Sequence, residues 1–349
     1  MPSNVFSSRI QAVFQVVFKE CKVDALIIEK PIDLFYLTGL NLSLGVLMIS
    51  KKGGHLFVDG RYLAFAKKNG PCPCEKTTSA ALTKILSSFS KVGFDSVSTS
   101  YARWQELKNL TKKELIPLKK PTDVIRAIKS PEEIKVLKKS AALLWKGVQF
   151  LKKNLNVGIT EEAAASLFEV YCLENGAESM AFEPIVSFGK NTAFPHHRPG
   201  STRLKKGDVV LLDLGVVVDH YHSDMTRTFF FGKPDPRLVA FEAAVKGAHD
   251  AALLLCRPGV KVGELDKVAH RVIEKAGLES YLAHSLGHGV GLEIHEFPRL
   301  KFRGEDSNVL LKEGMVITIE PGFYWPGVGG YRHENTIVIT RKGYENWYP

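Results

Sequence analysis

Residues 207–229 read GDVVLLDLGVVVDHYHSDMTRTF, two apolar runs joined by a short polar segment, and they set the fold of the C-terminal half. The runs predict two antiparallel strands with a turn near Asp219-His220. Each run carries an aspartate, Asp213 and Asp224, and a hairpin would place the two carboxylates side by side. A carboxylate in an apolar strand is costly unless its charge is paired or bound to a metal.

Two glutamates repeat this pattern further along the chain. Glu320 ends the apolar run VITIE, and Glu334 lies in GGYRHEN, where alternation puts Arg332 on the same face. His288 lies between glycines in GHG, which allow a close approach of the backbone. One imidazole and four carboxylates suit a pair of hard divalent cations, whereas a structural zinc favours Cys and His. For Asp213 alone, capping a turn or pairing with arginine is an equal alternative. The full set predicts a two-metal hydrolase.

Further histidines accompany these carboxylates in Gly- and Pro-rich segments. His196 and His197 follow the segment TAFP, His284 begins HSLGHG, and His295 follows LEI. A lone histidine is more often structural, but several beside a carboxylate cluster favour a role in the site.

The bulk properties narrow the function classes. The 349 residues suit two domains, and the apolar fraction of 45% is that of a globular protein. No apolar run approaches a membrane span and the first residues do not resemble a signal peptide, so we expect a cytoplasmic protein without membrane contacts. Five scattered cysteines predict free thiols rather than a disulfide framework. Most of the net charge of +10 falls in the first 125 residues, but without a long basic run that would favour nucleic acid binding.

The order of apolar runs and helical patterns divides the chain into an α/β domain at residues 1–125 and a catalytic domain at residues 126–349. In the first domain the patterns predict strands and helices that alternate. The strands are residues 25–29, 45–49, 55–58 and 92–94, and the helices are 61–68, 80–89 and 101–107, after an amphipathic N-terminal helix that includes Phe18.

The second domain opens with two helices and continues mainly with strands. Ser130-Pro131-Glu132-Glu133 is typical of a capped helix start, and that helix should run to about Asn154. The remaining predictions are a helix from Thr160 to Gly176, helices at 236–255 and 262–276, and strands at 184–188, 209–218, 226–231, 315–319 and 331–340.

Five segments in order resemble the metallopeptidases of the "pita-bread" fold, which include aminopeptidase P, prolidase, methionine aminopeptidase and creatinase. They are PIVSFGKNTAFPHH, GDVVLLDLGVVVDHYHSDMTRTF, HSLGHGVGLEIHEFP, TIEPGFYWPG and GGYRHEN. The resemblance implies a creatinase-like α/β N-terminal domain followed by an α+β catalytic domain with a curved, mostly antiparallel sheet. Tyr36-Leu37-Thr38-Gly39 is typical of that N-terminal domain.

The resemblance also implies roles for particular residues. It makes Asp213 a ligand of one metal ion, Asp224 and Glu334 the bridging ligands, and His288 and Glu320 ligands of the second ion. A hydroxide between the ions would attack the peptide bond, and Glu320 would handle its proton. The residues expected to contact substrate or assist catalysis are His196, His284, His295 and, for substrate binding, Arg332. Ligand hardness favours Mn²⁺, with Co²⁺ or Zn²⁺ as alternatives.

Within this family, the N-terminal domain and Arg332 favour a metallo-exopeptidase that cleaves Xaa-Pro bonds, similar to a short bacterial Xaa-Pro aminopeptidase or prolidase. We expect aminopeptidase P activity on peptides with proline at the second position, and prolidase activity on Xaa-Pro dipeptides is the alternative. Arg332 or a basic N-terminal loop could bind the carboxylate of a dipeptide. A hydrolase or lyase for a non-proline C–N bond and a non-catalytic binding protein are the other hypotheses. By analogy we also expect a homodimer.

Four histidines depart from the usual pattern of the family, and the sequence leaves their roles open: His197, His220, His222 and His333. His222 is placed by alternation on the same strand face as Asp224, so it either contacts the site or stays solvated.

Overall fold

The computed structural model describes residues 3–348 and divides into two compact units, residues 1–126 and 127–349. None of the helices it describes is long and apolar enough to cross a membrane.

The N-terminal unit is an α/β domain built on one mixed sheet, as predicted. Its six strands follow the order β4-β3-β2-β1-β5-β6, and β1 pairs antiparallel with β2 and parallel with β5. The strands are β1 (Ala25–Ile28), β2 (Val46–Ser50), β3 (Gly53–Val58), β4 (Cys74–Lys76), β5 (Lys91–Asp95) and β6 (Glu114–Leu118). The helices are α1 (Ser3–Cys21), α2 (Pro31–Thr38), α3 (Leu63–Asn69), α4 (Ser79–Leu86), α5 (Tyr101–Leu110) and α6 (Asp123–Ala127). The sequence patterns missed α2, α6, β4 and β6.

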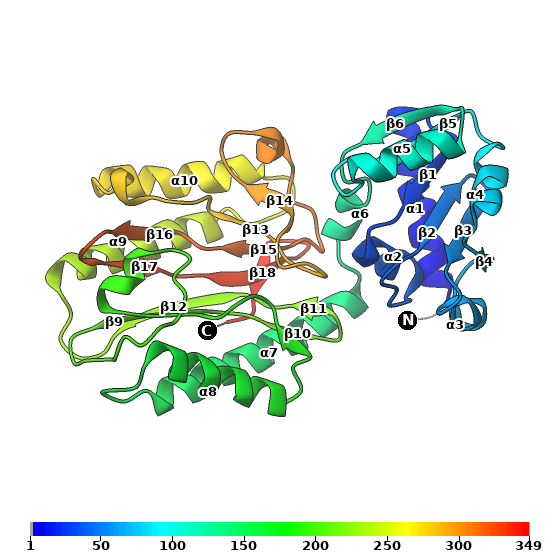
Figure 1. Ribbon diagram of the computed structural model, residues 1–349. Helices are drawn as coiled ribbons and strands as arrows, with labels where there is room; N and C mark the ends of the chain where they lie inside the picture. Colours follow the sequence, from blue (N-terminus) through cyan, green and yellow to red (C-terminus); the bar gives the residue numbers. More distant parts are fainter. Residues whose placement is uncertain (1–2, 349) are drawn as a thin grey trace. The chain divides into compact units, whose positions relative to one another are not determined.

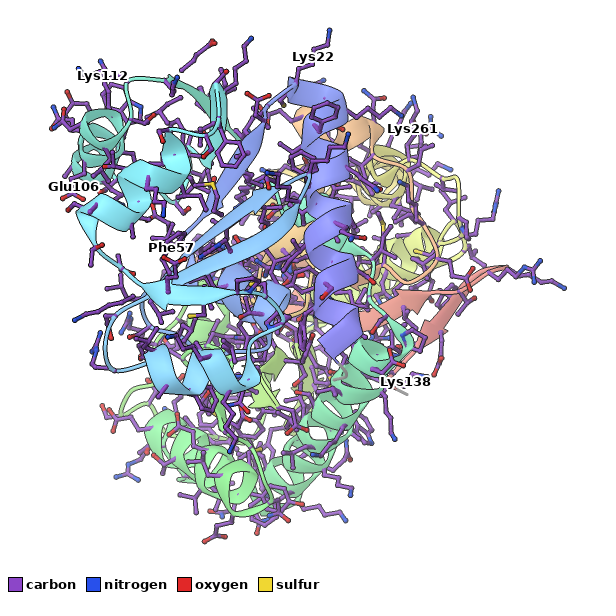
Figure 2. All side chains as sticks on the ribbon, turned by 90° about the vertical axis from the view of Figure 1, so that its right-hand side faces the viewer. Lys22, Phe57, Glu106, Lys112, Lys138 and Lys261 are labelled. Atoms are coloured by element: carbon purple, nitrogen blue, oxygen red, sulfur yellow. The ribbon has the colours of Figure 1, made fainter. Side chains whose placement is uncertain are left out.

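Burial in this unit follows the apolar patterns in most places, but some apolar side chains are exposed, among them Phe65 of α3 and Phe18 of α1. Phe57 of β3 is buried in the core, whereas Lys22 and Lys112 are exposed (Figure 2). The apolar face of α1 buries Ile10, but Phe18 near its end is 52% exposed, although helical spacing assigned it to the same face.

The C-terminal unit places two pairs of helices on opposite sides of antiparallel sheets (Figure 1). A three-stranded sheet of order β12-β9-β8 packs against α7 and α8, and a five-stranded sheet of order β14-β13-β15-β18-β19 packs against α9 and α10. Two small sheets, β11-β10-β7 and β16-β17, complete the unit. Every strand pairing that the structure describes here is antiparallel, which confirms the predicted α+β architecture.

The elements of this unit have the following bounds. The helices are α7 (Pro131–Asn154), α8 (Glu161–Glu174), α9 (Pro236–Leu253) and α10 (Val262–Lys275), with short 3-10 turns η1 (Gly189–Ala193), η2 (Glu279–Tyr281) and η3 (Glu305–Asn308). The strands are β7 (Ser179–Met180), β8 (Ile185–Phe188), β9 (Val209–Leu214), β10 (Val216–Val218), β11 (Tyr221–His222), β12 (Met225–Phe230), β13 (Gly287–Gly289), β14 (Glu296–Leu300), β15 (Val316–Ile319), β16 (Gly322–Trp325), β17 (Gly329–Arg332), β18 (Asn335–Ile339) and β19 (Tyr344–Asn346).

The helix starts predicted from the sequence are present in atomic detail. The hydroxyl of Ser130 accepts from the backbone N–H of Glu133, whose carboxylate accepts from the N–H of Ser130, so the capping box is complete. Thr160 caps α8 in the same way through the N–H of Ala163.

Two predicted long strands are each broken into two, and the breaks matter for the site. The run 209–218 forms β9 and β10 around Gly215, where a Cβ atom would lie 2.4 Å from the carbonyl oxygen of Ser223. The run 331–340 breaks at His333-Glu334, between β17 and β18. The turn at Asp219-His220 forms as predicted, with φ of 48° and 69°.

The turn at Asp219-His220 sets the register of the two aspartates. Val218 pairs with Tyr221 and Asp213 pairs with Thr226 in one continuous register, and Asp224 lies two residues before Thr226, in the gap between β11 and β12. The two aspartates are therefore diagonal neighbours across the hairpin and not directly opposite each other.

Candidate active site

One cavity of the C-terminal unit, with a volume of about 590 Å³, is lined by every residue that the sequence assigned to the site. These residues are His196, Asp213, Asp224, His284, His288, His295, Glu320, Arg332 and Glu334. They come from segments separated by as much as 138 positions, so only the folded chain brings them together.

The carboxylates occupy the ends and interruptions of strands. Asp213 lies near the end of β9, Asp224 precedes β12, Glu320 directly follows β15, and Glu334 fills the gap between β17 and β18. At such positions the backbone departs from the regular ladder, so a side chain can point along the sheet edge into the cavity.

Asp224, His288 and Glu334 form the tightest group. All three are buried, and one ligand atom from each lies within 4.8 Å of the others. The Nε2 atom of His288 lies 3.6 Å from Asp224 Oδ2 and 3.3 Å from Glu320 Oε1. A carboxylate pair and an imidazole at these separations match the donor set of a divalent cation.

Burial and mutual repulsion shift the pKa values of these carboxyls. Burial, followed by the neighbouring carboxylates, raises the pKa of Asp224 and that of Glu334 well above their usual values. Burial also raises the pKa of Asp213 despite the nearby Arg332. For Glu320, burial acts in the same direction, but the adjacent His288 outweighs it and lowers the pKa.

One oxygen atom of the cluster has no hydrogen bond among the residues described. Glu334 Oε2 accepts from the hydroxyl of Thr226 at 2.8 Å, whereas the buried Oε1 has no partner. An unsatisfied carboxylate oxygen costs a large desolvation free energy unless a ligand compensates it. Crowded carboxylates, raised pKa values and this oxygen together show that the residues fit divalent cations.

The side chain of Arg332 is engaged by the protein. Its guanidinium donates to Asp213, to the hydroxyl of Tyr324 at 2.5 Å and to the hydroxyl of Thr226 at 3.1 Å. It is only 3% exposed. These contacts place Arg332 in the wall of the cavity, where its charge offsets part of the negative charge of the carboxylates.

The three histidines of the prediction differ in their surroundings. His284 Nε2 lies 2.8 Å from the hydroxyl of Tyr324, and its Nδ1 lies 3.9 Å from Glu320. The ring of His295 meets that of His288 edge to face at 4.3 Å. Burial lowers the pKa of His284, and burial and the charge of His288 lower that of His295 to about 4. His196 lines the cavity from the loop after η1.

Sequence reasoning overlooked Tyr324 and Thr226, which connect these groups. Tyr324 contacts both His284 and Arg332, and burial raises its pKa to about 12. Its place in TIEPGFYWPG, four residues after Glu320, is the signal that could have identified it. Thr226, two residues after Asp224 in the chain, donates through its hydroxyl to Glu334.

The four unassigned histidines fall into different environments. His197 lines the cavity and its Nε2 lies 2.8 Å from the buried Glu161. His222 is not among the lining residues and its Nδ1 lies 3.3 Å from the carbonyl oxygen of Gly291. His220 lies in the β10–β11 turn, and His333 packs edge to face against His249 at 4.7 Å.

Comparison with known families gives two matches that together span most of the chain. The family described as metallopeptidase family M24 matches residues 135–341. The family described as creatinase/prolidase N-terminal domain matches residues 9–128.

Individual relatives are similar over nearly the full length. The Xaa-Pro dipeptidase of Pyrococcus horikoshii is 35% identical over 345 residues, which cover 97% of this chain and 96% of the relative. The structure of the Xaa-Pro dipeptidase from Bacillus anthracis has a TM-score of 0.92 at 30% identity and covers 98% of this chain and 97% of its own. The structure of an X-Pro aminopeptidase from Thermotoga maritima has a TM-score of 0.84 at 27% identity, with 94% and 96% covered.

Proposed function

Because the chain belongs to metallopeptidase family M24 and is a metallo-exopeptidase, we propose that it hydrolyses Xaa-Pro dipeptides. The support is the full-length similarity to Xaa-Pro dipeptidases, together with a cavity that gathers the whole predicted site. The sequence alone favoured aminopeptidase P, and the relatives support the dipeptidase alternative better.

The metal ligands in this proposal are Asp213, Asp224, His288, Glu320 and Glu334, with Mn²⁺ as the ion that suits four carboxylates and one imidazole. Two divalent cations held there would polarise the scissile carbonyl and lower the pKa of a water molecule. The unpartnered Oε1 of Glu334 and the raised pKa values of Asp224 and Glu334 are the observations that support this ligand set.

The remaining side chains would orient the substrate and manage protons. Glu320 is kept ionised by His288, so it can accept a proton and pass it to the leaving nitrogen. His295, with a pKa of about 4, is neutral near pH 7 and can hydrogen-bond the substrate without adding charge. His284 lies between the hydroxyl of Tyr324 and the carboxylate of Glu320, and His196, which also lines the cavity, would contact the substrate.

The cavity also offers features that suit a dipeptide ending in proline. Phe182, Ile185 and Ile294 give it an apolar side for the pyrrolidine ring. Arg299 of β14 lines the cavity and is exposed, whereas the guanidinium of Arg332 already donates to protein groups. We therefore assign the binding of the substrate carboxylate to Arg299, with Lys301 beside it, instead of Arg332.

The test compares three substrates with Mn²⁺-loaded protein: an Xaa-Pro dipeptide, an Xaa-Pro-Yaa tripeptide and an Xaa-Ala dipeptide. The dipeptide with proline should give the highest kcat/KM. Arg299→Met should raise KM for the dipeptide about tenfold to a hundredfold, because it removes a charge-assisted hydrogen bond to the substrate carboxylate. KM for the dipeptide amide, which has no carboxylate, should stay unchanged. Arg303→Met, an exposed arginine outside the cavity lining, is the control.

Three results would count against the proposal. Preferential cleavage of the tripeptide would indicate an aminopeptidase, equal cleavage of Xaa-Ala would remove the proline specificity, and an inert protein with every divalent metal would remove the activity.

A further inference from the structure

Arg227 has no role in the proposed reaction, although it belongs to the same segment as Asp224. It follows Thr226 in β12, so its side chain points to the opposite side of the sheet from the cavity. There its guanidinium carbon lies 5.6 Å from the ring centre of Trp145 in α7 and 5.8 Å from that of Tyr348. Both distances are within the range of cation–π contacts, which favour this position of the guanidinium.

From this position Arg227 reaches the chain segment that carries Glu334. Its Nη1 donates to the carbonyl oxygen of Glu334 at 2.6 Å and to that of Thr226 at 3.0 Å. Its Nη2 donates to the side-chain oxygen of Asn335 at 2.8 Å. The hydrogen bonds from this one planar guanidinium therefore hold the segment between β17 and β18 against β12. Burial lowers the pKa of Arg227 to about 10, which leaves it charged at neutral pH.

The same gap is held from the cavity side by different groups. The hydroxyl of Thr226 donates to Glu334 Oε2 at 2.8 Å, and the N–H of Glu334 donates to the carbonyl oxygen of Thr226 at 3.2 Å. The hydroxyl of Thr336 donates to the carbonyl oxygen of Asp224 at 2.8 Å. With its backbone and one oxygen fixed, Glu334 has its Oε1 as the oxygen left for a ligand.

We propose that Arg227 is a positioning residue for the metal centre, which acts through the backbone of Glu334 from the far side of the sheet. The role rests on the proposed function, because it requires that Glu334 binds metal. Residues that hydrogen-bond to a metal ligand without binding the metal themselves orient that ligand, and their loss typically weakens metal affinity 10-fold to 100-fold. Since Glu334 is one of the proposed metal ligands, the loss of Arg227 should weaken Mn²⁺ binding.

The geometry requires a guanidinium. A lysine carries the same charge, but its single ammonium group cannot present the planar fork that serves two carbonyl oxygens and an amide oxygen. Arg227→Lys should therefore fall between the wild-type protein and Arg227→Met in metal affinity.

The experiment is a calorimetric titration of the metal-free full-length protein with Mn²⁺. Arg227→Met should weaken Mn²⁺ binding about 10-fold to 100-fold. Arg237→Met is a matched control, because Arg237 also lies over an aromatic ring, Trp325 at 5.4 Å, but is exposed and pairs with Asp235. Its Mn²⁺ affinity should equal that of the wild-type protein.

Thermal unfolding separates positioning from a purely structural role. A structural role would lower the Tm of the metal-free and Mn²⁺-loaded forms equally, whereas a positioning role also shrinks the increase in Tm that Mn²⁺ produces. A folded Arg227→Met variant with wild-type Mn²⁺ affinity would overturn the inference. A wild-type protein that binds no Mn²⁺ would overturn the metal centre and this role with it, whereas inactivity toward Xaa-Pro peptides with intact Mn²⁺ binding would overturn only the substrate assignment.

If Arg227→Met does not fold, Asn335 provides the second test. Asn335→Ala removes one acceptor of the fork, and Asn335→Asp keeps an oxygen at that place. Weaker Mn²⁺ binding in Asn335→Ala with recovery in Asn335→Asp would support the role, and equal affinities in both variants would refute it.

Discussion

In the N-terminal unit the buried carboxylate of Asp33 faces the buried guanidinium of Arg126 at 2.8 Å, and the hydroxyl of Thr122 donates to the same oxygen. In the cavity of the C-terminal unit, the carboxylates of Asp213, Asp224, Glu320 and Glu334 share Arg332 and His288. The first cluster pairs one negative charge with one positive charge. The second gathers four acidic groups against one guanidinium, that of Arg332, and the imidazoles of His284 and His288, which carry a charge only when protonated.

The comparison of these two clusters indicates that the balance between buried negative and positive charges can distinguish a structural ion pair from a binding site. A balanced pair needs nothing from outside the protein, although it stabilises little compared with apolar packing. In the second cluster burial, followed by the neighbouring carboxylates, raises the pKa of Asp224 and of Glu334, and Glu334 Oε1 is left without a partner, so cations would stabilise the charged form of the cluster. Burial raises the pKa of Asp33 as well, but there the guanidinium of Arg126 opposes the shift.

Among the variants that test this comparison, Glu334→Gln should have the largest effect, which is on activity. Loss of a proposed metal ligand should remove about 4 kcal/mol or more of transition-state stabilisation, so kcat/KM for the Xaa-Pro dipeptide should fall about a thousandfold. The same change should raise the Tm of the metal-free protein, because it removes one of the repelling charges. Glu313→Gln, which changes an exposed carboxylate, should alter neither quantity. A metal-free Glu334→Gln variant that is less stable than the wild-type protein would contradict the charge imbalance.

A single substitution in the balanced pair should act in the opposite direction. Arg126→Met leaves the carboxylate of Asp33 buried and uncompensated, so the free energy of unfolding should fall by about 3–5 kcal/mol. The double variant Asp33→Leu/Arg126→Met should recover most of that loss, as urea denaturation would measure. Equal stabilities of the single and double variants would mean that the charge balance is not what matters.

The smallest effect concerns a balanced pair in the catalytic unit itself. Lys129 Nζ lies 3.0 Å from Glu296 Oε2, and both side chains are buried. Glu296 also accepts from the N–H of Glu293, in the loop that carries His295. Lys129→Met should destabilise the protein, and adding Glu296→Gln, which keeps an acceptor for Glu293, should recover about 2 kcal/mol of unfolding free energy.

The variants of this pair test whether its charge balance or its position near the cavity determines the change in unfolding free energy. If adding Glu296→Gln to Lys129→Met lowers the unfolding free energy further, the position of the pair near the cavity determines the change, and charge balance does not. Urea denaturation of the single and double variants decides between the two.

The amino-acid sequence by itself determined the local features of this protein. Ser130, Pro131 and Glu133 specify the start of α7, and Asp219-His220 specifies a tight turn, because capping and turn chemistry act over a few residues. The carboxylates in apolar strands likewise indicated a metal site, because a buried carboxylate needs a paired charge or a metal, and the order of the five motifs resembled the metallopeptidase family.

Tertiary structure alone decided the arrangement of those groups. Glu320 and Glu334, more than a hundred positions after Asp213, reach the same cavity as Asp213 and Asp224 only because the separate sheets of the unit pack together. Arg332 lies against Asp213 and Tyr324, and Arg227 holds Glu334 from behind, through residues 107 positions apart in the chain. Such contacts depend on which sheets and helices pack together, and the periodicity of a single segment carries no information about its distant neighbours.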